Sequence, residues 1–229
     1  DKYGPQQEVD PWRDYGNGVD LSGNYIRGND PLETSLPVDQ EFTRGWIEHL
    51  VEQHGTAEAG GVRYYALDNE PMLWNSTHRD VHPEPASYDE VLAKGIATAN
   101  TIKDVDPTAE ILGPTVWGWS AYFYSALDMA GEGAWWANPQ DQNTHGGQPF
   151  LPWYLEEMAE AEASTGRRLL DYLDIHYYPQ HPGVTLTREA GTKATQQARL
   201  ESTRSLWDPS YRDPTWIDTE VQRIPRIVT

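Results

Sequence analysis

A glutamate that directly follows an apolar, aromatic-rich segment is the residue of this chain best placed for chemistry. Residues 61–67 read Gly-Val-Arg-Tyr-Tyr-Ala-Leu, which is typical of a buried β-strand, and the chain then changes to Asp68-Asn69-Glu70-Pro71. Pro71 has no amide hydrogen for a strand ladder and therefore ends the strand. Parallel α/β proteins gather catalytic groups at such C-terminal strand ends. We interpret Glu70 as a catalytic acid/base; the alternative is a glutamate that only caps the following helix.

A second predicted strand end carries a histidine and a tyrosine. Residues 170–175 read Leu-Asp-Tyr-Leu-Asp-Ile, and His176 and Tyr178 follow just before Pro179. Side chains two positions apart on an extended chain point to the same side, so we expect His176 and Tyr178 on one face. A structural core histidine is the alternative for His176, but it does not account for the whole group.

Tryptophans follow two of the predicted strand ends. Trp74 lies shortly after Glu70, and Trp117 and Trp119 follow a strand expected over 110–114. The chain has 10 Trp and 13 Tyr but 3 Phe, a bias towards rings with a polar group that suits half-hydrated grooves. The indoles of Trp74 and Trp117 could therefore stack on sugar rings, although each could equally cover the core.

The elements that must position these residues alternate between helix and strand. Residues 1–37 are rich in Gly, Asp, Asn and Pro and predict a long loop region. Residues 38–229 predict the order α-β-α-β-α-β-α, which indicates a parallel sheet. The helices are expected from 38 to Gly55, from an N-cap at Ser87 to Asp106, over 150–164 and over 191–206. Functional groups at the ends of three such strands favour part of a (β/α)8 TIM barrel.

Composition excludes several classes of function. The chain carries 36 Asp and Glu against 17 Lys and Arg, a formal net charge of −19, which disfavours nucleic acid and anionic membranes as partners. It has no cysteine, so disulfides and thiol catalysis are excluded. It has neither a G-x-G-x-x-G nor a G-K-[ST] motif, which argues against nucleotide binding. No run approaches the ~18 apolar residues that span a bilayer.

Two groups of residues raise the question of a metal. Glu8, Asp10, Asp14 and Asp20 could offer oxygens to calcium, but their spacing matches no EF-hand loop and favours solvated acids. His78 and His82 are four positions apart in a proline-bounded loop without an evident third ligand. We therefore predict no metal site and no required cofactor, and leave a structural calcium ion open.

A set of segments in consistent order resembles the endoglucanases of glycoside hydrolase family 44. The segments are 65–71, 73–74, 76–78, 82–83, 102–107, 113–114, 168–179, 198–200, 205–211 and 216–217. The resemblance implies a (β/α)8 barrel, normally joined to a small β-sandwich, that hydrolyses internal β-1,4-glucan bonds with retention. It also implies substrates such as soluble celluloses, xyloglucan and mixed-linkage glucans.

The resemblance also implies roles for individual residues. Glu70 becomes the general acid/base, Asn69 a hydrogen-bond partner of the sugar at the cleavage point, His176 a substrate contact, and Tyr178 the residue that orients the nucleophile. The family's nucleophile is a glutamate in an Ile-Thr-Glu-Tyr-like motif on the seventh strand, and that motif is missing here. Glu220 resembles a strand-end glutamate and is the lesser alternative for the nucleophile, but its segment is similar to a family loop ahead of that strand. We therefore expect the nucleophile beyond Thr229.

We therefore expect a partial barrel without the first and last strands and without the β-sandwich. Such a piece should have negligible hydrolase activity and marginal stability by itself. The whole protein is expected to be a secreted monomer that acts on β-1,4-glucan, with any signal peptide outside this chain. The alternatives are a non-catalytic glucan-binding barrel and a mannanase or xylanase of the same clan.

Overall fold

The fold centres on a small parallel sheet. The computed structural model describes residues 3–12, 15–185 and 187–217 of the 229. These residues form a three-stranded sheet in the order β1 (Tyr64–Ala66), β2 (Glu110–Val116) and β3 (Tyr172–Ile175), with both strand pairs parallel. The predicted alternation of helices and strands and the parallel sheet are confirmed. The C-terminal ends of the strands consequently meet at one edge.

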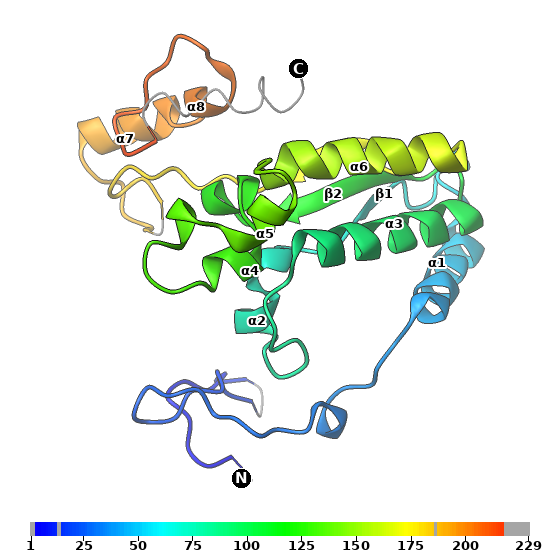
Figure 1. Ribbon diagram of the computed structural model, residues 1–229, viewed down its shortest axis with the longest axis horizontal. Helices are drawn as coiled ribbons and strands as arrows, with labels where there is room; N and C mark the ends of the chain where they lie inside the picture. Colours follow the sequence, from blue (N-terminus) through cyan, green and yellow to red (C-terminus); the bar gives the residue numbers. More distant parts are fainter. Residues whose placement is uncertain (1–2, 13–14, 186, 218–229) are drawn as a thin grey trace.

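Three long helices cover one face of this sheet. Each precedes one strand: α1 (Gln40–His54), α3 (Tyr88–Val105) and α6 (Phe150–Thr165). Helix α3 lies in the middle and packs against both α1 and α6 (Figure 1). Sequential strand order with all crossover helices on one face is the arrangement of a βαβ repeat. No helix within the described ranges is both long and apolar enough to cross a membrane.

Local sequence signals explain the helix ends. The Ser87 hydroxyl accepts the Glu90 amide at 3.2 Å and starts α3, as predicted, and Asp39 caps α1 in the same way. Gly55, with a φ of 85°, ends α1 at the predicted position because glycine adopts this conformation without steric cost. The Glu90 carboxylate contacts the His82 imidazole at 2.7 Å.

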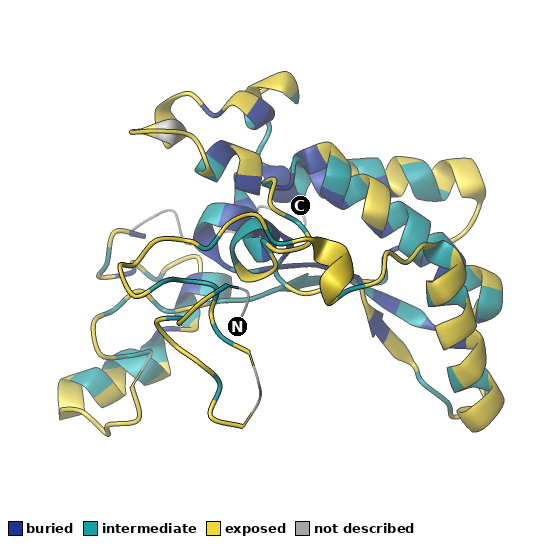
Figure 2. Ribbon diagram, turned by 90° about the horizontal axis from the view of Figure 1, so that it is seen from below, coloured by how far each residue is buried: buried dark blue, intermediate teal, exposed yellow. Residues whose placement is uncertain are grey.

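The two faces of the sheet differ in burial. Tyr65, Leu67 and Ile111 are buried and belong to the hydrophobic core against the helices. The buried parts of the chain, dark blue in Figure 2, gather near the centre of the molecule. Alternate residues point the other way. Tyr64 and Tyr172 are 51% and 46% exposed on that second face, with their rings 6.0 Å apart edge to face. The sheet therefore presents one packed face and one accessible face.

The ends and breaks of some elements differ from expectation. Strand β2 was expected to stop at Pro114, but it continues to Val116, and a register shift between Pro114 and Val116 carries its pairing with β3 past the missing amide hydrogen. The single helix expected over 191–206 is wrong: Ser202 and Thr203 interrupt it, giving α7 (Lys193–Glu201) and α8 (Arg204–Trp207). Short helices break the other loops: η1 (Pro31–Glu33), η2 (Pro71–Leu73), α2 (Trp74–Thr77), η3 (Trp119–Tyr122), α4 (Ala126–Met129), η4 (Trp135–Ala137) and α5 (Gln140–Thr144).

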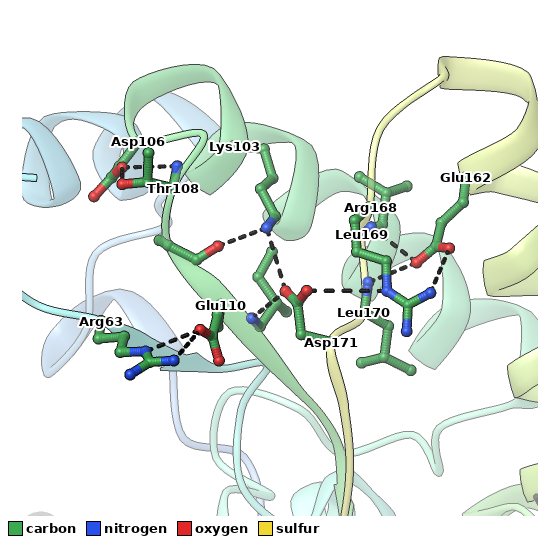
Figure 3. A network of polar contacts seen from close by, with 12 residues as sticks. Arg63, Lys103, Asp106, Thr108, Glu110, Glu162, Arg168, Leu169, Leu170 and Asp171 are labelled. Carbon is green, nitrogen blue, oxygen red and sulfur yellow. Dashed lines mark hydrogen bonds and ion pairs between the residues drawn. The ribbon is translucent and has the colours of Figure 1, made fainter. Parts of the chain in front are cut away.

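A polar network closes the edge of the sheet at the N-terminal ends of the strands (Figure 3). The Lys103 ammonium group, only 9% exposed, lies 3.2 Å from Asp171 Oδ2, which also accepts the Ile111 amide at 2.8 Å. One carboxylate therefore joins the end of α3 to both β2 and the start of β3. We assign these contacts a role in stability, because catalytic groups of parallel α/β proteins lie at the opposite edge, at the C-terminal strand ends.

Glu162 belongs to an acidic run of α6 but accepts hydrogen bonds from the backbone of another segment. Its Oε1 atom accepts the amides of Leu169 and Leu170, both at 3.0 Å, and its side chain is 18% exposed (Figure 3). The carboxylate therefore satisfies backbone donors in the connection from α6 to β3. Helical periodicity alone could not reveal this, because the acceptor role depends on where the chain turns back.

Candidate active site

Glu70 lies in a strained turn just beyond β1. The backbone of Asp68 has a φ of 85° and that of Glu70 a φ of 52°, both in the left-handed region that non-glycine residues avoid. The Glu70 amide donates to the Thr115 carbonyl at 2.9 Å, which ties this turn to β2, and η2 begins at the next residue. Conformations of this kind cost about 1–3 kcal/mol each and cluster at functional sites.

The structure brings His176 to Glu70. Nδ1 of His176 lies 2.6 Å from Oε1 of Glu70, and the two side chains are 32% and 19% exposed. The backbone of His176 is held on both sides: its amide donates to the Val116 carbonyl at 2.8 Å, and its own carbonyl accepts the Tyr122 hydroxyl at 2.6 Å. The imidazole is therefore fixed against the carboxyl group by contacts to two other segments.

Thr115 lies between these groups and was not anticipated from the sequence. It is 4% exposed and has a φ of 55°, an outlier for a β-branched residue. Its carbonyl accepts the Glu70 amide, and its hydroxyl donates to Asp174 Oδ2 at 3.2 Å. Thr115 thus connects the turn after β1 to β3. Its position after Gly113-Pro114 is the only sequence signal we can identify.

Asn69 and Tyr178 lie on accessible parts of the same edge. Asn69 is exposed, and its amide donates to Asp68 Oδ1 at 2.6 Å. Tyr178 is 42% exposed, and a Cβ atom on Gly118 would lie 3.7 Å from its ring. Tyr177, between His176 and Tyr178, turns inward, and its hydroxyl donates to the Ser202 carbonyl at 2.8 Å. Tyr177 therefore points inward while Tyr178 is exposed, as alternation along an extended chain predicts.

The tryptophans occupy different environments. Trp74 is 8% exposed, with the Lys94 ammonium group 4.7 Å from its ring centroid and His82 5.1 Å away. This burial favours the second of the two roles considered for Trp74, that its indole covers the core. Trp117 is half-buried at the rim of the core, and its indole nitrogen finds no hydrogen-bond partner among the described residues. Trp119 is 5% exposed and packs on Tyr177.

The family model for glycoside hydrolase family 44 matches residues 1–181, well over half of the chain. This chain belongs to glycoside hydrolase family 44. The parallel α/β arrangement and the segment around Glu70 both lie within the matched part.

Individual proteins are similar to this chain in sequence and in structure. Endoglucanase A of Paenibacillus lautus is 40% identical over 192 residues, which are 82% of this chain and 26% of that protein. The crystal structure of CelM2, a bifunctional glucanase-xylanase from a metagenome library, superposes with a TM-score of 0.88 at 48% identity, covering 98% of this chain and 43% of CelM2. A Paenibacillus polymyxa family-44 xyloglucanase superposes with a TM-score of 0.67 at 32% identity, covering 81% and 36%. The chain therefore spans less than half the length of each of these relatives.

Two of the acidic residues considered for calcium, Asp10 and Asp20, accept hydrogen bonds from neighbouring residues of their own loops. Asp10 accepts the Trp12 amide and the Tyr15 hydroxyl, and Asp20 accepts the amides of Ser22 and Asn24. Asp14 lies outside the described residues, as does Glu220. Within the described ranges, no three His, Asp or Glu side chains converge in a way that would hold a metal ion.

A buried aspartate organises the loop that follows Trp117 and Trp119. Asp128 is 3% exposed, and its carboxylate accepts the amides of Asp141 and Gln142 at 2.7 and 3.2 Å. Burial, together with the nearby charge of Asp141, raises the pKa of Asp128 above its ordinary value. Asp141 in turn accepts the Tyr88 amide at 2.9 Å, so this loop is joined to the start of α3.

Proposed function

We propose that this chain supplies the acid/base part of the active site of a retaining endo-β-1,4-glucanase. Glu70 is the proposed acid/base, and the observation that carries this assignment is its 2.6 Å contact with His176 at the C-terminal edge of the sheet. Family membership and the names of the relatives, an endoglucanase, a xyloglucanase and a glucanase-xylanase, support the reaction class.

In this mechanism Glu70 protonates the glycosidic oxygen as the bond breaks and later removes a proton from the attacking water. His176 holds Oε1, so we assign proton transfer to Oε2 of the same carboxyl group. Asn69 is the proposed hydrogen-bond partner of the sugar at the cleavage point, and Tyr178 the proposed partner of the nucleophile. The nucleophile must be a second carboxylate about 5–5.5 Å away. Following the family resemblance, we place it outside this chain.

We further propose that the sheet is part of a (β/α)8 barrel completed by other strands of the whole protein. The accessible face with Tyr64 and Tyr172 would then become the barrel interior. Without those strands the chain would leave apolar surface and strand edges uncovered, so we propose that the 229 residues alone have marginal stability and negligible hydrolase activity.

The proposed substrates are β-1,4-glucans, including xyloglucan. Xylan and mannan are second candidates because the named relatives include a glucanase-xylanase and, at 37% identity, a β-mannanase/endoglucanase of Caldicellulosiruptor saccharolyticus. A panel of carboxymethylcellulose, xyloglucan, xylan and mannan separates these possibilities. We propose a secreted monomer that needs no cofactor, because two carboxylates suffice for the chemistry.

The test is Glu70→Gln in the whole protein, with Glu52→Gln on the exposed face of α1 as a matched control. General acid–base catalysis contributes about 10²–10⁴-fold, so hydrolysis of xyloglucan should fall by that factor while its binding persists. Azide needs no base to attack a glycosyl-enzyme, so it should partly restore turnover of an activated aryl cellobioside and give a glycosyl azide with retention. Hydrolysis that survives Glu70→Gln overturns the assignment. Binding without any hydrolysis by the wild type supports a non-catalytic glucan-binding protein instead.

A further inference from the structure

A cavity separate from the Glu70–His176 pair lies between the N-terminal segment and the loop after α2. Its volume is about 1020 Å³, at the upper end of the range for small-molecule sites. Residues within the stretches 3–6, 15–18 and 25–34 form one wall, and residues within 75–83 form the other. Figure 1 shows the N-terminal segment extending past α2 before it returns to the body of the protein at α1.

Arg79 holds the two walls together. Its guanidinium group donates to the Asn17 carbonyl at 2.6 Å and to the Ser76 carbonyl at 2.9 Å, and it lies 4.3 Å from the centroid of the Tyr25 ring. Gly18 makes this approach possible, because a Cβ atom there would lie 2.4 Å from a guanidinium nitrogen. The cation is therefore committed to two carbonyls and a ring.

Other hydrogen bonds link and support the two walls of the cavity. The side-chain amide of Asn29 donates to the Asp80 carbonyl at 3.1 Å, which is a second link between the walls. Within the N-terminal segment, Val19 pairs with Tyr25 in an antiparallel bridge, and the Tyr3 hydroxyl donates to Glu33 at 2.9 Å. The cavity is thus bounded by a folded segment with its own hydrogen bonds.

The lining suits a neutral ligand with many hydroxyl groups. Tyrosine rings, side-chain amides and carboxylates offer both donors and acceptors beside flat apolar surfaces. Tyr25 is 54% exposed although one side carries Arg79, so much of its ring remains available for contact. Acidic and basic groups are mixed: Asp30, Glu33 and Asp80 lie with Arg27, His78 and Arg79. This balance, with Arg79 already engaged, favours neither an anion nor a cation.

We propose that this cavity is a distal saccharide subsite for the substrate chain that is cleaved at Glu70. Asn75 lines the cavity and follows Glu70 by five residues, so their Cα atoms lie within about 19 Å of each other. The turn and η2–α2 segment thus leads directly from the candidate acid to the cavity. The inference rests on the proposed glucanase function and adds a place where long substrates gain contacts that short ones cannot reach.

The test compares Tyr25→Ala and Asn75→Ala with Trp12→Ala, an 87% exposed aromatic of the same segment that does not line the cavity. Affinity for cellohexaose is measured by calorimetry on the whole protein in the Glu70→Gln background, so that it does not depend on turnover. Loss of one aromatic contact should weaken cellohexaose binding about five- to tenfold for Tyr25→Ala. Asn75→Ala should also weaken it, and Trp12→Ala should not. Tyr25→Phe, which keeps the ring, should retain most of the affinity.

Steady-state kinetics of the same variants, made in the protein that retains Glu70, give the second readout. The ratio of kcat/KM for cellohexaose to kcat/KM for an aryl cellobioside should fall five- to tenfold in Tyr25→Ala. An unchanged ratio together with unchanged cellohexaose affinity in both Tyr25→Ala and Asn75→Ala overturns the subsite. Persistent hydrolysis in Glu70→Gln would overturn the proposed function instead, so the two failures are distinct.

Discussion

Glu70 and His176 are 106 positions apart in the sequence, yet Nδ1 of the imidazole lies 2.6 Å from Oε1 of the carboxyl group. Both residues are anchored to the end of the central strand, because Thr115 accepts the Glu70 amide and Val116 accepts the His176 amide. The contact therefore depends on β2 as well as on the strands that precede Glu70 and His176. We therefore propose that His176 acts by positioning Glu70.

Replacing His176 should reduce the rate more than the apparent affinity. His176→Ala in the whole protein should lower kcat on xyloglucan by about 10²-fold with a small change in KM, because a displaced acid is costly even when substrate still binds. His176→Asn retains a polar nitrogen near the position of Nδ1 and should recover part of the loss. Steady-state kinetics check this. A raised KM with unchanged kcat would instead make His176 a substrate-binding residue, as the family resemblance implies.

Removing the Thr115 hydroxyl should affect both stability and rate. Thr115→Val keeps the side-chain shape but loses the bond to Asp174, so the free energy of unfolding should fall by about 1 kcal/mol and kcat severalfold. Thr165→Val is the control, since that exposed hydroxyl only contacts carbonyls of its own helix, α6. Denaturant unfolding and kinetics provide the measurements. Equal effects of the two substitutions would contradict a special role for Thr115.

Asp106 should make stability depend on acid pH. It is fully buried and accepts the Ala57 amide at 2.7 Å and the Thr108 hydroxyl at 2.6 Å. Burial alone would raise the pKa of Asp106, but these hydrogen bonds, with further bonds from the amides of Thr108 and Ala109, outweigh it and lower the pKa below its ordinary value. Its contribution is therefore present above an unfolded-state pKa of about 3.9 and is lost as pH falls through the lower folded-state pKa.

The variant Asp106→Asn checks this dependence. It should be less stable than the wild type by about 1–3 kcal/mol at pH 7, and the difference should narrow as pH falls below about 4. Unfolding free energies of the whole protein, measured between pH 7 and pH 3, provide the comparison. A difference that stays constant over this range would show that the charge of Asp106 does not contribute.

The ion pair at the N-terminal edge of the sheet should matter more than an exposed pair nearby. Lys103→Met removes the 9% exposed partner of Asp171 and should cost about 2–3 kcal/mol in unfolding free energy. Arg167→Met breaks a shorter contact, 2.6 Å to Asp104, but both side chains are 40% exposed, so the cost should stay below about 1 kcal/mol. Denaturant unfolding of both variants tests this order. The reverse order would contradict the role given to Lys103.

Local and periodic features of the fold could be predicted from the sequence. The caps at Ser87 and Gly55 and the alternation of helices and strands follow from short-range chemistry. The meeting of Glu70 and His176 was also foreseeable in outline, because the C-terminal ends of parallel strands share an edge. The pattern of predicted strands was enough to place Glu70 and His176 in the same candidate site.

Features set by tertiary contacts could not be predicted. The sequence allowed Trp74 either to stack on a sugar or to cover the core. Its burial depends on contacts with Lys94 and His82, which belong to other segments. The left-handed backbone of Thr115 violates the preference of its residue type and is held by neighbours in space. Arg79 stands in a loop without periodicity, and only the returning N-terminal segment gives it partners.

The position of Thr115 and Val116 has a consequence for redesign. Their carbonyls orient both members of the candidate pair before the chain enters the loop that begins at Trp117. Grafts confined to residues 130–139 would keep Asp128 and Asp141, whose hydrogen bonds hold this loop, and the Tyr122 contact to His176, so the alignment of the acid should persist. Directed evolution of substrate preference could vary that stretch while the strand ends are kept constant.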